Sequence, residues 1–248
     1  MEKVKQLDDD QLEGFDWEFI DSEKRQAIFT QINRDFPSGE FSFIDIGGGN
    51  GSFTDRVLNA FPKSKGLVID NSEMLLSKNE PRAGKSVLCE SVENLENVLT
   101  EKYDIVFFNL ILHHLVGDSY SASRQFQRKE LEQAIRVLDD RGRISVFENV
   151  YDGSVIDSVP SHMIFNLTVS KPLKKLVSKL GANTAGVGVC FLSKRQWEAE
   201  LSGVGLQVTN YSNHREFEIN KLKKTVLHLG YVRGGHFWCE TTAQVPGN

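Results

Sequence analysis

The 248-residue sequence has few cysteines and lacks any long apolar run. Its three cysteines, Cys89, Cys190 and Cys239, form no close pair, which excludes a disulfide framework and a cysteine-based zinc site. No stretch approaches the roughly 18 consecutive apolar residues of a transmembrane helix, and the charged N-terminal residues are unlike a signal peptide. We therefore expect a cytoplasmic protein with ordinary thiols and no membrane span.

Basic residues are outnumbered by acidic ones. The sequence has 29 Lys and Arg against 34 Asp and Glu, a formal net charge of −5, which repels nucleic acid unless a local basic patch reverses the field. Nucleic acid is therefore not an expected partner. The content of 40% hydrophobic and 25% charged residues is that of a soluble globular protein. No repeat is present, which excludes solenoids and propellers.

Short runs of Val, Ile, Leu and Phe alternate with amphipathic or polar stretches. After the first run, four apolar residues recur at helical spacing over 53–61, and Pro62 ends that helix. A second amphipathic helix is predicted over 127–138, followed by a turn at 139–142. This order predicts an α/β fold with a parallel sheet, closed at its far edge by the last two strands. The predicted strands are 41–46, 66–69, 86–89, 104–109, 143–147, 206–208 and 236–241.

The alternation divides the chain into four segments. Residues 1–36 precede the sheet and are predicted to form a helical cap that docks through its apolar side chains, and residues 37–150 form the core. The rhythm breaks over residues 151–192, which we interpret as a helical lid insertion. Residues 193–248 return to the core with a helix and the closing strands, and Ser193 is the candidate N-cap of that helix. The lid is predicted to contain one helix whose apolar face is Leu173, Leu176, Val177 and Leu180.

The most informative segment is a glycine-rich turn after the first strand. Such a turn lets a ligand approach the backbone, and the helix that follows supplies free N–H donors. The dinucleotide fingerprint requires glycines spaced G-x-G-x-x-G, but from Gly47 and Gly49 that spacing reaches Ser52, and the next glycine is Gly51. The spacing argues against a nicotinamide dinucleotide.

The pattern of Asp45, Gly47, Gly49 and Gly51 instead resembles the first motif of the class I S-adenosylmethionine-dependent methyltransferases. Asp70 ends the next strand, 19 residues beyond Gly51, and matches that family's acidic ligand of the ribose hydroxyls. The resemblance implies a Rossmann-like fold with a seven-stranded, mostly parallel sheet and helices on both faces.

Two further landmarks follow in the order that the family has. Cys89 to Leu95 resembles the turn that contacts adenine, with Ser91 where the family usually has Asp. Tyr103 to Leu115 resembles the fourth motif of the small-molecule enzymes, beside the methionine end of the cofactor. The resemblance implies S-adenosyl-L-methionine as cofactor. The implied ligands are Asp45, Gly47, Gly49, Gly51, Asp70, Asn71, Ser91, Val92, Asn109 and Leu110.

Histidines are the leading catalytic candidates, because a hydroxyl acceptor benefits from a base with a pKa near the working pH. His113 and His114 are adjacent, so on a helix they point about 100° apart, and we slightly favour His114. A pair at this place is also common in the family and can simply support the loop. His162, in the lid, is the third candidate. His214 and His228 are expected at the surface, and His236 is expected to begin the last strand.

Substrate contacts are predicted from three residues. Trp17 of the cap and Phe165 of the lid are candidates to line an apolar acceptor pocket, with ordinary core packing as the alternative. Glu148, at the end of a strand, suits either a substrate hydroxyl or amine or the cap of a helix. The lysines of the lid helix form a solvated face, or alternatively contact anionic lipid or an acidic partner. They are Lys171, Lys174, Lys175 and Lys179.

Several other enzyme classes lack their signatures here. A metal-dependent catechol-type enzyme needs an acidic ligand where this chain has Asn109, so no metal is expected. The motif of nucleic-acid amino-methyltransferases, Asn/Asp-Pro-Pro-aromatic, is absent from the same position. No tyrosine precedes a lysine by four residues, which argues against a short-chain dehydrogenase.

The sequence therefore predicts methyl transfer to an oxygen or nitrogen atom of a small molecule in a biosynthetic pathway. Two alternatives remain open: an enzyme of the same fold that methylates a protein or RNA, and a noncatalytic protein that only binds the cofactor. The sequence does not predict the acceptor or the oligomeric state.

Overall fold

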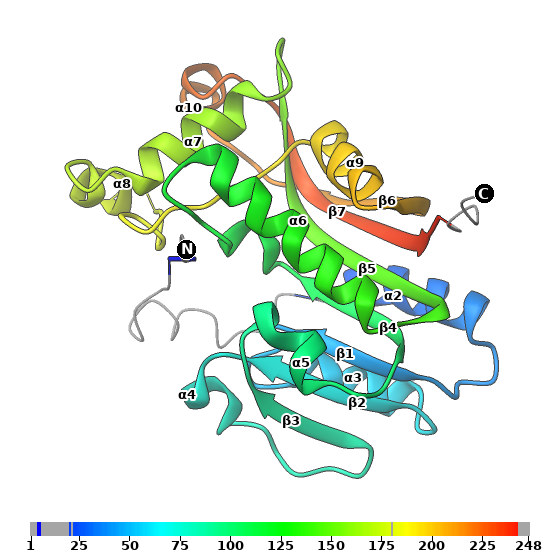
Figure 1. Ribbon diagram of the computed structural model, residues 1–248. Coiled ribbons are helices and arrows are strands. Elements are labelled where there is room, and N and C mark those ends of the chain that lie inside the picture. Colours follow the sequence, from blue (N-terminus) through cyan, green and yellow to red (C-terminus); the bar gives the residue numbers. More distant parts are fainter. Residues whose placement is uncertain (1–3, 6–19, 21, 180, 243–248) are drawn as a thin grey trace, which may run out of the picture.

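The computed structural model describes residues 4–5, 20, 22–179 and 181–242 (Figure 1). Its centre is a seven-stranded sheet in the order β3-β2-β1-β4-β5-β7-β6. Strands β1 to β5 pair in parallel, and β7 pairs antiparallel with both β5 and β6. The predicted fold, seven-stranded and mostly parallel, is confirmed.

The strands are β1 (Ser42–Ile46), β2 (Lys65–Asp70), β3 (Lys85–Cys89), β4 (Tyr103–Asn109), β5 (Leu138–Gly153), β6 (Leu206–Glu216) and β7 (Leu229–Thr241). The α-helices are α2 (Ser22–Asp35), α3 (Ser52–Ala60), α4 (Glu73–Leu76), α5 (Leu95–Val98), α6 (Tyr120–Arg136), α7 (Val159–Val169), α8 (Lys174–Lys179), α9 (Lys194–Gly203) and α10 (Lys221–Val226). In the described part of the chain, the 3-10 helices η2 (Val92–Asn94) and η3 (Leu112–His114) follow β3 and β4.

The sheet is covered on both faces, and its central strands alternate between two buried clusters. In β1, Phe43 joins the cluster that packs under α2 and α3, and Ile44 joins the cluster under α5, α6 and α9. In β4, Phe107 and Phe108 divide in the same way. Successive strand side chains point to opposite faces, so a strand buried on both sides is apolar throughout. This explains the continuous apolar runs of the sequence.

Strands β5 and β7 are longer than predicted. Their antiparallel pairing runs from Ile144 opposite Cys239 to Gly153 opposite Leu229, so β5 continues into the predicted lid segment 151–192. Leu138, predicted to end a helix, begins β5 instead. β7 lies antiparallel between β5 and β6, and its pairing extends β5 beyond the parallel part of the sheet, which local periodicity does not reveal.

Two predictions about the helices meet different outcomes. Ser193 caps α9 as predicted: its side chain accepts from the Gln196 N–H, and the Gln196 side chain accepts from the Ser193 N–H. In the lid helix α8 only Val177 is buried, and Leu173 and Leu176 are exposed. Of the predicted apolar face, only Val177 is therefore covered; Leu173 precedes this six-residue helix, and Leu180 lies outside the described residues.

The N-terminal cap is described only in part. Helix α2 lies within the predicted segment 1–36 and buries Ile28 and Ile32 against the sheet, whereas Trp17 lies outside the described residues. No helix in the described part of the chain is long and apolar enough to cross a membrane.

Two histidines expected elsewhere are buried in the sheet. His214, expected at the surface, is largely buried on β6 and lies 5.0 Å from the Phe147 ring. His236, expected to begin the last strand, lies within β7, is fully buried and has its Nε2 3.0 Å from Ser145 Oγ. Burial, and then the neighbouring His214, lower the pKa of His236 to about 3. Both predictions failed because the extended pairing of β5, β6 and β7 covers these positions.

Acidification should destabilise the fold through His236. Its folded-state pKa of about 3 is below the ordinary 6.5, so the unfolded chain binds the proton first, and unfolding free energy falls by up to about 1.4 kcal/mol per pH unit between these values. His236→Gln removes the titrating ring and keeps a polar group toward Ser145. Its unfolding free energy, measured by urea denaturation at pH 7 and pH 4.5, should fall less than that of the wild type.

His228→Gln, at an exposed position beside the start of β7, is the matched control and should retain the wild-type slope. Equal slopes for the wild type and His236→Gln would contradict the assignment.

Candidate functional site

Three loops converge at the carboxyl edge of the parallel strands. They follow β1, β2 and β4, and the strand order reverses between β1 and β4. In open α/β sheets a crevice forms at this reversal, and ligands bind there. The predicted cofactor residues lie on these three loops and on the turn after β3.

The glycine turn between β1 and α3 has a backbone conformation that residues with a side chain rarely adopt. Gly47, Gly49 and Gly51 have φ angles of 67°, 50° and 72°, in the left-handed region. A Cβ atom at Gly51 would lie 1.9 Å from Asn79 Oδ1, and one at Gly47 would lie 2.7 Å from Ile111 Cγ1. The start of α3 has no side-chain cap. The turn is therefore a tight backbone cradle at a helix N-terminus.

Asp70 connects the second loop to the glycine turn. Its carboxylate accepts hydrogen bonds from the N–H groups of Gly49 (3.0 Å) and Ser72 (2.9 Å). Burial raises the pKa of Asp70, and these hydrogen bonds act in the opposite direction. A carboxylate has about four acceptor positions, so the group is oriented by the backbone and retains capacity for two ligand hydroxyls.

Asp45 joins the glycine turn to β4. Its buried carboxylate accepts from Thr54 Oγ1 (2.9 Å) and from Asn109 Nδ2 (3.3 Å). Burial raises the pKa of Asp45 to about 7. The remaining amide oxygen, Asn109 Oδ1, is buried and has no hydrogen-bond partner in the described part of the chain, which suits a ligand that brings a donor such as an ammonium group. Leu110, next in the chain, has a φ of 58°, an uncommon conformation for a non-glycine residue.

The turn after β3 is organised by a residue that sequence reasoning missed. Ser91, predicted to contact adenine, donates from its N–H to Glu90 Oε1 (2.8 Å), and Asn94 Nδ2 donates to the same oxygen (2.9 Å). These hydrogen bonds lower the pKa of Glu90. Ser91 and Val92 are half-buried and Asn71 is exposed. The acidic residue of this turn thus stands one position before Ser91.

Glu148 is fully buried and organises the loop after β4. Its Oε1 accepts from the N–H groups of Leu112 (2.8 Å) and His113 (3.4 Å), and its Oε2 lies 2.6 Å from His113 Nδ1. Of the two roles considered for Glu148, the structure shows the helix cap, at the start of η3. The same carboxylate fixes the orientation of the His113 ring.

The two adjacent histidines lie together. On η3 the rings of His113 and His114 are 4.1 Å apart and tilted by 40°, instead of pointing to different sides as expected for an α-helix. Burial, and then His113, lower the pKa of His114 well below 6.5. The His113 ring also lies 4.7 Å from Phe191, and Phe191 stacks on Tyr151 at 4.3 Å. These four rings form a row, which we call the aromatic row.

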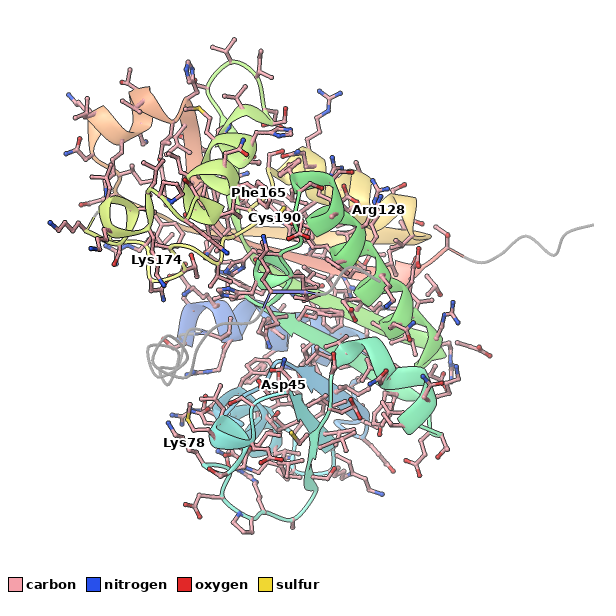
Figure 2. All side chains as sticks on the ribbon, turned by 60° about the vertical axis from the view of Figure 1, so that its left-hand side comes forward. Asp45, Lys78, Arg128, Phe165, Lys174 and Cys190 are labelled. Carbon is pink, nitrogen blue, oxygen red and sulfur yellow. The ribbon has the colours of Figure 1, made fainter. Side chains whose placement is uncertain are left out.

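The remaining predicted residues lie away from this group. His162 is exposed on α7, with its ring 3.9 Å from Tyr120. Within the described residues no hydrogen bond or ring contact joins it to His113 or Glu148. Phe165 is buried in the same core cluster as Cys190 (Figure 2), so core packing is the role that the structure shows. Trp17 lies outside the described residues.

The missed residues differ in how visible they are from sequence. Thr54 lies on the buried face of α3. A polar residue among the apolar ones of that face is a sign in the sequence of a buried hydrogen bond. Asn79, whose amide donates to Gly49 O (2.8 Å), and Phe191 reach the site only through the fold. In the described part of the chain no group of three or more His, Cys, Asp or Glu is placed to hold a metal ion.

Comparison with known proteins agrees with this geometry. The family described as "Methyltransferase domain" matches residues 44–144, which contain the glycine turn, Asp70, Asn109 and the histidine pair. Residues 44–144 therefore resemble a methyltransferase domain. No curated protein matches the sequence.

Solved structures share the fold of the methyltransferase domain. LepI in complex with SAM has a TM-score of 0.56 at 15% identity, over 86% of this chain and 46% of its own. The mitomycin 7-O-methyltransferase MmcR has a TM-score of 0.52 at 18% identity, and the match covers 89% of this chain and 58% of MmcR. A protein described as a pericyclic reaction enzyme has a TM-score of 0.51 at 15% identity, and the match covers 82% of this chain and 43% of that protein. This chain therefore spans about half the length of these proteins, and the likeness establishes the fold.

Gly51→Ala should destabilise the fold more than glycine conformation alone explains. A side chain at φ +72° costs about 1–2 kcal/mol, and the Cβ also overlaps Asn79 Oδ1. Gly39→Ala is the matched control, because Gly39 has a φ of 68° and its nearest atom would be 3.8 Å away. Urea denaturation should give the larger loss for Gly51→Ala, and adding Asn79→Ala should recover part of it. Equal losses at both glycines would show that the approach of Asn79 does not matter.

Proposed function

We propose that the protein transfers a methyl group from S-adenosyl-L-methionine to an oxygen or nitrogen atom of a small-molecule acceptor. The observation that carries this proposal is the convergence of the glycine turn, Asp70 and the Asp45–Asn109 pair at the carboxyl edge of a methyltransferase domain. Together they offer a tight backbone turn, a carboxylate for hydroxyls and a buried amide oxygen that has no hydrogen-bond partner among the described residues.

Each group suits one part of the cofactor. Asp70 would bind the ribose hydroxyls, the turn with Ser91 and Val92 would border adenine, and Asn109 and Leu110 would face the methionine end. Asn71 adjoins the ribose position. When bound, the cofactor supplies a methyl group on a positively charged sulfur, which an acceptor displaces in line. The protein's contribution is to hold the acceptor collinear with that bond and to exclude water.

Within this reaction His113 is our preferred base for a hydroxyl acceptor. Glu148 binds Nδ1 of the His113 ring. This leaves Nε2 of His113 to accept the proton of the acceptor hydroxyl. We prefer His113 to His114, because the lowered pKa of His114 makes that ring a weak proton acceptor at neutral pH. His162 remains a candidate on α7, and the segment of α7 and α8 remains our candidate lid over the acceptor.

Cofactor binding should depend on Asp70. Titration calorimetry with S-adenosylhomocysteine should give tight binding to the wild type and binding weaker by about 30- to 150-fold for Asp70→Ala, because a buried bidentate contact contributes roughly 2–3 kcal/mol. Asp139→Ala, at an exposed position, is the control and should bind as the wild type does. Absence of binding to the wild type would withdraw the cofactor assignment.

Catalysis should depend on His113 and, through it, on Glu148. With an acceptor found by screening for S-adenosylhomocysteine formation, His113→Ala should lower kcat by about 100- to 10,000-fold, the usual contribution of a general base. Glu148→Gln should lower kcat less, because the amide keeps the shape of the side chain but no longer offers a charged acceptor to Nδ1 of the His113 ring. Both variants should bind S-adenosylhomocysteine as the wild type does.

Glu200→Gln is the matched control, since Glu200 is also fully buried but pairs with Arg124 and Arg128 between α6 and α9. An unchanged kcat in His113→Ala would show that His113 is not the general base. Methylation of a protein or RNA but of no small acceptor would favour the macromolecular alternative, and a cofactor bound but never demethylated would favour the noncatalytic one.

A further inference from the structure

Positive charge is concentrated in two segments of this acidic protein. The whole chain has a net charge of −5, yet residues 158–197 contain no Asp or Glu, and residues 219–239 contain none either. The first segment includes α8 and the second includes α10. Their basic residues are Lys171, Lys174, Lys175, Lys179, Lys194 and Arg195 in the first, and Lys221, Lys223, Lys224 and Arg233 in the second.

Both helices lie at the same end of the molecule. In Figure 1, α8 and α10 lie on either side of α7, and in Figure 2 the labelled Lys174 lies at that end of the view, on the opposite side from the labelled Arg128 of α6. All four lysines of the α8 region are exposed. On α10, Lys224 pairs with Glu216 (3.2 Å), which offsets part of the charge there.

Aliphatic side chains project from the same end. Helix α10 buries none of its residues, and Leu222 and Val226, one turn apart, are 71% and 56% exposed. The loop between β5 and α7 carries Val155 and Ile156, which are 88% and 62% exposed. The Ser154 N–H donates to His228 O (2.9 Å), so this loop is fixed beside the end of α10. We call these four side chains the aliphatic tip.

We propose that the aliphatic tip and the lysines of α8 and α10 dock the protein on the surface of an anionic lipid bilayer. The lysines complement anionic headgroups, and the aliphatic side chains would enter the boundary between headgroups and acyl chains. The tip protrudes from a loop and a separate helix, so a fluid surface can cover it all at once. A folded protein partner would need a separate shaped pocket for each element.

Vesicle co-sedimentation with the full chain tests the proposal. Vesicles of phosphatidylcholine with about 30% phosphatidylglycerol should bind the protein at low salt, with binding that weakens as salt is raised. Vesicles of phosphatidylcholine alone should bind much less. Val155→Ser combined with Ile156→Ser should weaken binding to the anionic vesicles by about tenfold or more, since two aliphatic side chains lose their burial.

A matched pair of exposed valines serves as the control. Val87 on β3 and Val98 on α5 are 48% and 41% exposed, outside the aliphatic tip, and their replacement by serine should leave vesicle binding unchanged. Titration with S-adenosylhomocysteine, run in parallel, checks that every variant remains folded.

Three results would overturn the proposal. The first is no binding to anionic vesicles at low salt, and the second is equal binding to neutral vesicles. The third is unchanged binding to anionic vesicles in Val155→Ser combined with Ile156→Ser, which would show that the aliphatic tip does not enter the bilayer.

Discussion

The buried carboxylate of Asp45 is the constraint on which the candidate site depends. Its two hydrogen bonds connect β1 to α3 through Thr54 and to β4 through Asn109. Burial alone would disfavour a charge here, as the pKa of about 7 reflects. A Cβ at Gly48 would lie 2.7 Å from Asp45 Oδ2, so the backbone passes close over the carboxylate. The glycine turn and the end of β4 are therefore set relative to each other by one side chain.

A second buried carboxylate has the corresponding role in the loop after β4. Glu148, on β5, binds two backbone N–H groups of η3 and the ring of His113. The loop is held further by Gln127, which donates to Leu112 O and Cys190 O. Because a buried carboxylate without partners is strongly disfavoured, the position of η3 and that of Glu148 depend on each other. The aromatic row extends this rigid group toward β5 through Phe191 and Tyr151.

The fold by itself does not decide the reaction. Proteins with this architecture include an O-methyltransferase and one described as a pericyclic reaction enzyme, so the chemistry must be argued from the side chains of each site. Here those are the oriented imidazole of His113 on η3 and, at the end of β4, a buried amide oxygen with no hydrogen-bond partner among the described residues. The charge distribution adds a separate property, since the lysines of α8 and α10 lie outside the convergence of loops that carries the cofactor residues.

Local signals in the sequence predicted the parallel half of the fold well. The strands of residues 41–109 are short apolar runs bounded by turns, and the glycine pattern with Asp70 and Asn109 indicated the cofactor region, because backbone cradles and strand-end carboxylates leave a mark within a few residues. The capping box of Ser193 is local for the same reason.

What the sequence alone determined, then, was the order of elements and which loops carry the predicted cofactor residues, and the tertiary structure decided the rest. The extended pairing of β5 with β7 placed His236 and His214 inside the sheet, and the long-range contact of Glu148 with η3 brought the two histidine rings together. Contacts such as Asn79 with Gly49 and Phe191 with His113 join residues far apart in the chain. No local periodicity encodes them, because they follow from how whole strands and helices pack.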